Sequence, residues 1–104
     1  MTGIVDATTD TFQEETASGL VLVDFWAAWC GPCRQLGPVL EQIAQSRDDV
    51  KIVKVDVDAE PELAGRFGIT SIPAMKIFRD GELVEEMTGV RPRPVIEQAL
   101  DRAS

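Results

Sequence analysis

Histidine is absent from this 104-residue sequence, and cysteine occurs only twice. Without histidine, the chain lacks the usual base of a thiol protease and the commonest metal ligand in proteins. A structural zinc site needs about four ligands, which two cysteines cannot supply within one chain, and an iron–sulfur cluster meets the same shortage. We therefore expect no bound metal and no histidine-assisted catalysis.

Basic residues and long apolar runs are also scarce. The chain has 10 lysines and arginines against 18 acidic residues, for a net charge of −8, and this balance disfavours nucleic acid as a partner. No apolar run approaches the roughly 18–20 residues that a membrane span needs. The first ten residues show no basic segment followed by a long apolar one, so we expect no secretory leader and a cytoplasmic location. The length predicts one domain, residues 1–104.

The apolar pattern predicts a strand–helix–strand unit in the first half of the chain. Residues 20–27, LVLVDFWA, form a near-continuous apolar run typical of a strand buried on both faces. Residues 50–58 form a second such strand. Between them lies a helical stripe that continues past Pro38, which we expect to kink the helix rather than end it. The stripe consists of Leu36, Val39, Leu40, Ile43 and Ala44. This order predicts a βαβ unit with parallel strands.

The remaining segments predict the outer elements of an α/β fold. Thr9 or Asp10 is expected to cap the start of a first helix, with Gly19 as its stop signal, and a short helix covers residues 61–67. Two strands flank the Asp80-Gly81 turn. A last helix, residues 95–103, has one apolar face, made by Val95, Ile96, Ala99 and Leu100. The sequence predicts a βαβ half, then a ββα half, in a central mixed β-sheet flanked by helices on both faces.

The two cysteines occupy the turn from the first strand into its helix, in WAAWCGPC. The N-terminus of a helix favours negative charge, so a thiolate at Cys30 is stabilised there. Pro32 suits the first helical turn. Cys33 lies one turn later, within reach of Cys30, and we expect it to be less exposed. A structural disulfide closing so small a loop stabilises little, and the spacing in a βαβ unit favours a redox pair in which Cys30 attacks and Cys33 resolves.

A lone carboxylate, Asp24, interrupts the first strand. Keeping it charged and buried costs several kcal/mol. It either sits at a sheet edge or pairs with Lys54 of the next strand, or it is a desolvated base with a raised pKa that accepts the Cys33 proton. We favour the base. Trp26 is expected to be half buried, and Trp29, in the loop before Cys30, to form an exposed apolar rim for a protein partner.

WCGPC after VDFWA, with Pro38, Ile72-Pro73 and Gly89 downstream, resembles the thioredoxin family over essentially the whole chain. The resemblance implies the thioredoxin fold and a protein-disulfide reductase that forms a mixed disulfide with its client through Cys30. It also implies that Asp24 and Lys54 match the family's proton-transfer position, and that Pro73 is a cis-proline facing the cysteines. The implied substrate-binding rim adds Gly31, Pro32, Ile72, Gly89 and Val90.

The resemblance also implies the partners. They are client proteins that carry disulfides and an NADPH-dependent, flavin-containing thioredoxin reductase, with this chain as a monomeric electron-transport protein. It implies no bound cofactor besides the redox-active disulfide Cys30–Cys33.

Two segments depart from the expected pattern: Ala74, Met75 and Lys76 follow Pro73 where threonine and aliphatic residues are expected, and Arg91 and Arg93 lie near the implied rim. The arginines favour acidic clients.

Two other functions stay open from the sequence alone. A disulfide donor or isomerase is one, although such relatives typically place histidine between the cysteines, where this chain has Gly31-Pro32. The second is a docking subunit or chaperone-like binding module that uses the same apolar rim without electron transfer.

Overall fold

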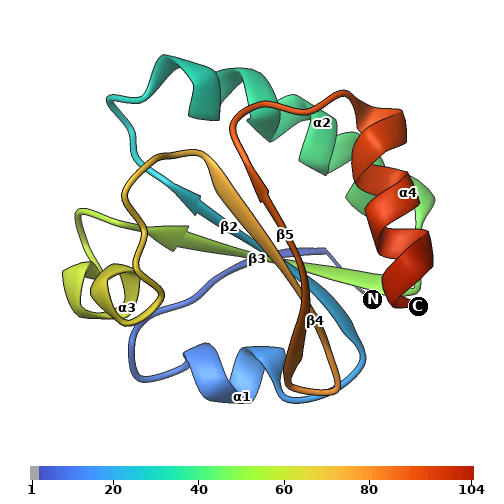
Figure 1. The fold of residues 1–104 in the computed structure, drawn as a ribbon, viewed down its shortest axis with the longest axis horizontal. Coiled ribbons are helices and arrows are strands. Elements are labelled where there is room, and N and C mark those ends of the chain that lie inside the picture. Colours follow the sequence, from blue (N-terminus) through green and yellow to red (C-terminus); the bar gives the residue numbers. More distant parts are fainter. Residues whose placement is uncertain (1–2) are drawn as a thin grey trace.

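The computed structural model describes residues 3–104, so the first two residues of the predicted domain lie outside the described part. In that part the chain forms nine elements around one sheet (Figure 1). In order they are β1 (Ile4–Asp6), α1 (Phe12–Thr16), β2 (Leu20–Trp26), α2 (Gly31–Ser46), β3 (Val50–Asp56), α3 (Pro61–Arg66), β4 (Ala74–Arg79), β5 (Glu82–Thr88) and α4 (Arg93–Ala103).

The sheet is mixed, with the strand order β1-β3-β2-β4-β5. β3 pairs in parallel with both β1 and β2, whereas β4 runs antiparallel to β2 and β5 antiparallel to β4. The predicted βαβ and ββα halves are therefore confirmed. β2 lies at the centre, hydrogen-bonded on both sides, which explains why its sequence is apolar on both faces.

Two helices cover each face of the sheet (Figure 1). Successive side chains of a strand point to opposite faces, so β2 sends Leu20 and Leu22 one way and Val21 and Val23 the other. The first pair packs in the core beneath α2 and α4, and the second in the core beneath α1 and α3. The redox motif begins at the end of β2 and leads into α2.

The predictions of two helices need correction. α1 begins after Thr11, not after Thr9 or Asp10, and it ends at Thr16; Gly19 lies beyond it, with a φ of 74°, in the turn into β2. α4 begins at Arg93, and Val95 is 40% exposed, because Ile96 sets the buried face one position later. The structure also adds the short strand β1, which the sequence analysis missed. By contrast, α2 passes through Pro38 without ending, as predicted.

Candidate active site

The cysteine pair lies at the N-terminus of α2, where the sequence places it. Cys30 is the N-cap residue in an extended conformation, and its Sγ accepts a hydrogen bond from the backbone N–H of Cys33 at 3.2 Å. Pro32, within the first turn, has no N–H to leave unpaired. The two sulfurs form a disulfide, with the Cα atoms 5.3 Å apart. A sulfur of Cys30 that gains negative charge therefore already has a backbone donor.

Both cysteines are buried. Cys30 is 4% exposed and Cys33 is 5% exposed, so the expectation that Cys33 is the less exposed of the two is wrong. A small apolar cluster that includes Ala27, Val57 and Ile72 surrounds both residues. A client disulfide must therefore reach Cys30 through the groups that border this cluster.

The loop before β4 faces Cys30. The Ile72–Pro73 peptide bond is cis, as the resemblance implied, and the Ile72 carbonyl oxygen lies 3.9 Å from Cys30 Sγ. The Gly89 N–H donates to the Pro73 carbonyl oxygen at 2.8 Å, so the end of β5 is fixed to the same loop. Gly89 has a φ of 86°, a conformation that favours glycine. Three of the predicted site residues, Ile72, Pro73 and Gly89, are thus brought together with Cys30.

The remaining predicted rim residues lie at the surface. Trp29 is 67% exposed and Val90, next to Gly89, is 39% exposed. Pro32 is exposed, while Gly31 is partly buried. Trp26 is half buried and Trp29 is exposed, as predicted, while the role of Trp29 in binding a partner stays a prediction. These residues form a partly apolar border next to the disulfide.

Trp29 has a partner that the sequence analysis missed. Its indole N–H donates to Asp58 Oδ2 at 2.7 Å. Asp58 lies 29 positions away, just after β3, and only the parallel β2–β3 pairing brings the two loops together. The signal that would have found it is the alignment of these two strand ends. The contact fixes the orientation of a large exposed side chain at the border of the site.

Asp24 lies behind the cysteine-bearing helix. It is 1% exposed on the central strand β2, so the sheet-edge interpretation is wrong. Because it lies two positions after Leu22 on the strand, it points to the same face of the sheet as Leu22, toward α2. Burial raises the pKa of Asp24 to about 6, and the nearby charge of Lys54 acts in the opposite direction. A carboxyl group in this range exchanges protons near neutral pH.

Lys54 is in register with Asp24 on β3. Its ammonium group lies over the ring of Trp26, with Nζ 4.5 Å from the ring centroid. Lys54 also lines a cavity of about 290 Å³ between β1 and α2, together with residues that include Asp6 and Glu41. The predicted juxtaposition of Asp24 and Lys54 is present, and an acidic cavity borders it.

The two arginines after β5 do not share a location. Arg91 stays beside Gly89 and Val90, with Nη1 3.5 Å from the Val90 carbonyl oxygen. Arg93 donates to Glu97 and to Ser46 Oγ, each at 2.7 Å. Ser46 is the last residue of α2, whereas the cysteines are at its first turn, so the expectation that Arg93 lies near the rim is wrong.

Within residues 3–104, no group of three or more histidine, cysteine, aspartate or glutamate side chains is placed to hold a metal ion. None of the helices described is both long and apolar enough to cross a membrane.

The fold and the site define a class of protein. A cysteine pair at the first turn of a helix, opposite a cis-proline loop on a mixed sheet, is the arrangement of the thioredoxin-fold oxidoreductases. The sequence model of the family described as Thioredoxin matches residues 3–102, and the chain belongs to the thioredoxin family.

Named relatives support this assignment over nearly the full length. The thioredoxin of Listeria monocytogenes is 49% identical over 100 residues, covering 95% of this chain and 97% of the relative. The thioredoxin of Bacillus subtilis is 46% identical over 100 residues, covering 95% and 96%. Among solved structures, a mutant thioredoxin from Halobacterium salinarum superposes with a TM-score of 0.91 at 32% identity, covering 97% of this chain and 90% of the other. Thioredoxin from Malassezia sympodialis gives 0.87 at 33% identity, covering 98% and 90%.

Membership of the family establishes the activity. The chain is a thiol–disulfide oxidoreductase, a protein-disulfide reductase whose redox group is the Cys30–Cys33 disulfide. The family needs no cofactor for this chemistry, and its partners are disulfide-bearing client proteins and thioredoxin reductase. A function limited to docking, or to donating disulfides, is not favoured.

Proposed function

We propose that the reduced protein cleaves client disulfides in two exchange steps. In the first, the Cys30 thiolate attacks one sulfur of the client disulfide; an S–S bond forms between Cys30 and the client, and the other client sulfur leaves as a thiolate. In the second, the Cys33 thiol loses its proton and attacks Cys30 Sγ, which releases the second client sulfur as a thiolate. Two electrons pass to the client, and the Cys30–Cys33 disulfide remains.

The N-terminus of α2 is the observation that carries this assignment. Cys30 is the N-cap, and its sulfur already accepts the Cys33 N–H. The positive end of the helix dipole and this donor both lower the energy of a thiolate at Cys30. Cys33 lies inside the first turn, where its own sulfur has no equivalent role. The asymmetry favours Cys30 as the attacking thiol and Cys33 as the resolving one.

Asp24, together with Lys54, is proposed to handle the proton of Cys33. Asp24 faces α2 and its pKa is about 6, so it is a competent acceptor near neutral pH. Lys54 tunes that pKa through its charge. The cavity that Lys54 lines is proposed as the route by which this proton exchanges with solvent. This chain has no histidine to take the same role.

The border of the site is proposed to bind the client chain. The cis-proline loop places the backbone carbonyl of Ile72 beside Cys30, and this backbone is proposed to pair with an extended client segment. The apolar and glycine positions around it leave space for the approach. The proposed contacts are Trp29, Gly31, Pro32, Ile72, Pro73, Gly89 and Val90.

The cellular setting extends the same proposal. Residues 1–104 act as one domain and as a monomer in the cytoplasm, within an electron-transport chain. An NADPH-dependent, flavin-containing reductase returns the electrons. Support comes from the full-length similarity to bacterial thioredoxins and from the presence of both cysteines in one chain.

The reduction potential of the Cys30–Cys33 couple tests this function. Equilibration in defined dithiol/disulfide buffers, followed through the fluorescence of Trp26 and Trp29, gives the potential directly. We expect a value below that of the glutathione couple, where each 30 mV corresponds to roughly 1.4 kcal/mol. A markedly more oxidising value would support a disulfide donor or isomerase instead. Absence of any reversible couple would leave only the docking function.

A further inference from the structure

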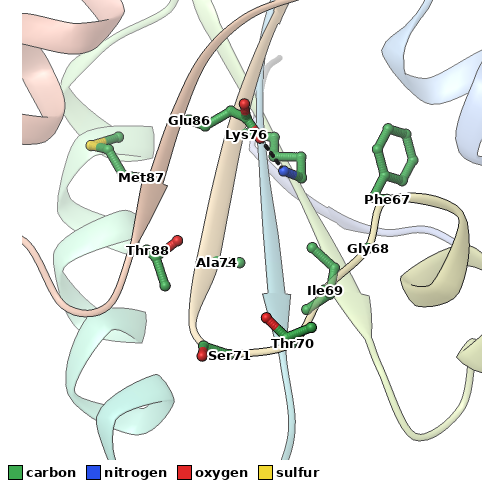
Figure 2. Close-up of a pocket in the computed structure, with 10 residues that line it drawn as sticks. All are labelled: Phe67, Gly68, Ile69, Thr70, Ser71, Ala74, Lys76, Glu86, Met87 and Thr88. Carbon is green, nitrogen blue, oxygen red and sulfur yellow. Dashed lines mark hydrogen bonds and ion pairs between the residues drawn. The ribbon is translucent and has the colours of Figure 1, made fainter.

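A second cavity lies on the opposite face of the sheet from α2. It has a volume of about 420 Å³ and lies between the loop of residues 67–71 and the strands β4 and β5 (Figure 2). Figure 2 shows Lys76 and Glu86 at one end of it, and Thr70, Ser71 and Thr88 toward the other. None of these residues has a role in the exchange steps above.

Lys76 is an unusual residue for its position. It is 8% exposed and shares its strand face with the buried side chains of Ala74 and Phe78. A buried ammonium group is costly unless it is paired, and an apolar residue of similar length would pack there without that cost. Packing alone therefore does not account for a lysine here.

The ion pair of Lys76 leaves binding capacity unused. Its ammonium group carries three hydrogens, and Glu86 Oε1 is the acceptor it meets. The side chain of Glu86 is 60% exposed, whereas that of Lys76 is 10% exposed. Because Glu86 is largely solvated, it can turn into solvent when another carboxylate takes its place beside Lys76, so the ammonium group stays paired. The cation, by contrast, is fixed in the wall of the cavity.

The cavity adjoins the proposed client-binding border. Its wall residues Ser71 and Thr88 immediately precede Ile72 and Gly89 in the chain. Lys76 is four positions beyond Ile72, roughly 13 Å along an extended strand. A client segment held beside the cis-proline loop can therefore reach the cavity with a side chain about three to five residues from its cysteine.

We propose that this cavity is a client subsite in which Lys76 binds the carboxylate of an aspartate or glutamate side chain, with the hydroxyl groups of Thr70, Ser71 and Thr88 lining its entrance. The inference rests on the proposed client-binding border. It assigns a substrate class: clients with an acidic residue close to the reactive cysteine. Because the protein carries a net charge of −8, a local cation is needed to make such clients favourable.

Matched peptide substrates test the subsite. Each contains the same disulfide and differs only by glutamate or glutamine, placed in turn three, four or five residues from the cysteine. We expect the reduced protein to cleave the best-placed glutamate peptide about three- to tenfold faster than its glutamine twin, as for one charge-assisted hydrogen bond. Lys76→Met removes this preference and leaves the rate for the glutamine peptide unchanged. Glu86→Gln removes the internal competitor and increases the preference.

Two control variants complete the design. Lys51→Met removes a partly buried lysine that is paired with Glu15 elsewhere on the molecule, and it keeps the preference. Arg91→Gln removes the cation beside Val90, and it also keeps the preference.

Equal rates for all glutamate and glutamine pairs in the wild type would overturn the subsite. A preference that survives Lys76→Met but is lost in Arg91→Gln would place the carboxylate at Arg91 instead. Failure to cleave either peptide would contradict the proposed function itself, a different result from loss of preference.

Discussion

Asp24 and Lys54 lie in register on neighbouring parallel strands, but the ammonium group of Lys54 packs over Trp26 rather than saturating the carboxylate. Within residues 3–104, Asp24 Oδ1 is buried without a hydrogen-bond partner. Folding therefore favours the protonated form of Asp24 over the charged form, and the pKa of Asp24 rises from 3.8 to about 6. A single side chain thus lowers the stability of the fold at neutral pH and supplies a base behind the active-site helix.

The first prediction concerns stability. Between pH 3.8 and about 6 the folded state binds more protons at Asp24 than the unfolded state does, so stability falls as the pH rises through this window. Above it the full cost of about 3 kcal/mol is present, and below it the cost vanishes. Asp24→Asn should therefore raise the free energy of unfolding by about 3 kcal/mol near neutral pH and by almost nothing below the window. Denaturant unfolding of the oxidised protein measures this. The exposed Asp10→Asn variant serves as control, and an equal gain at both pH values would contradict the explanation.

The second prediction concerns the pH profile of disulfide reduction. The charge of Lys54 lowers the pKa of Asp24, so Lys54→Met should move that pKa above about 6. If Asp24 accepts the Cys33 proton, the midpoint of the rate against pH moves upward in the same direction. Lys51→Met, on the same strand but paired with Glu15, should leave the midpoint in place. Asp24→Asn should remove this midpoint and slow the reaction. An unchanged pH profile in both Lys54→Met and Asp24→Asn would rule out the proton transfer.

The sequence predicted the central elements because their apolar patterns are strong. The predicted strands 20–27 and 50–58 are strands over Leu20–Trp26 and Val50–Asp56, and α2 begins directly after Cys30. The weak points were short or locally ambiguous. β1 has three residues and is held by its pairing with β3, which is a tertiary interaction that no local pattern reports. Val95 fits a helical stripe as well as its neighbours do, and only packing selects Ile96.

Only part of the candidate site could be predicted from local sequence. Asp24 stands out as a charge within an apolar run, and the cysteines by their spacing, so local sequence was enough for both. Asp58 and the cavity at Lys76 depend on strand ends and loops brought together by the sheet. Arg93 has the same charge as Arg91 two positions earlier, and only the start of α4 turns it toward Ser46.

The third prediction concerns the attachment of α4 to the rest of the fold. Arg47, at the end of α2, pairs with Asp49 at 2.8 Å and with Asp101 of α4 at 2.9 Å, and its guanidinium lowers the pKa of Asp49. Arg47 is mostly buried while both partners are largely exposed, so the network is worth about 1 kcal/mol. Arg47→Met should lower the free energy of unfolding by that amount at low salt.

Salt and acid distinguish this network from simple packing. The loss in Arg47→Met should shrink in high salt, because screening weakens the wild-type pairs. It should also shrink as the pH falls through the lowered pKa of Asp49, where the carboxylate becomes protonated. Arg79→Met, which removes an exposed arginine whose acidic neighbour Asp80 lies 3.9 Å away, should change stability less. A loss that is the same at all salt concentrations would assign the effect to the aliphatic part of Arg47.

The fourth prediction separates the roles of the two cysteines. Cys33→Ser keeps the thiolate at the helix N-terminus but removes the resolving thiol, so the Cys30–client bond should persist. Incubation with a disulfide-bearing protein client, then non-reducing electrophoresis and mass spectrometry, should reveal one covalent complex through Cys30. Cys30→Ser is the matched control and should form little complex, because Cys33 lies inside the first turn of α2 and lacks the N-cap position that stabilises a thiolate. Equal trapping by both variants would contradict the asymmetry.

The double variant Cys30→Ser, Cys33→Ser should lose cellular function; full retention would show that docking, not electron transfer, is what the cell requires.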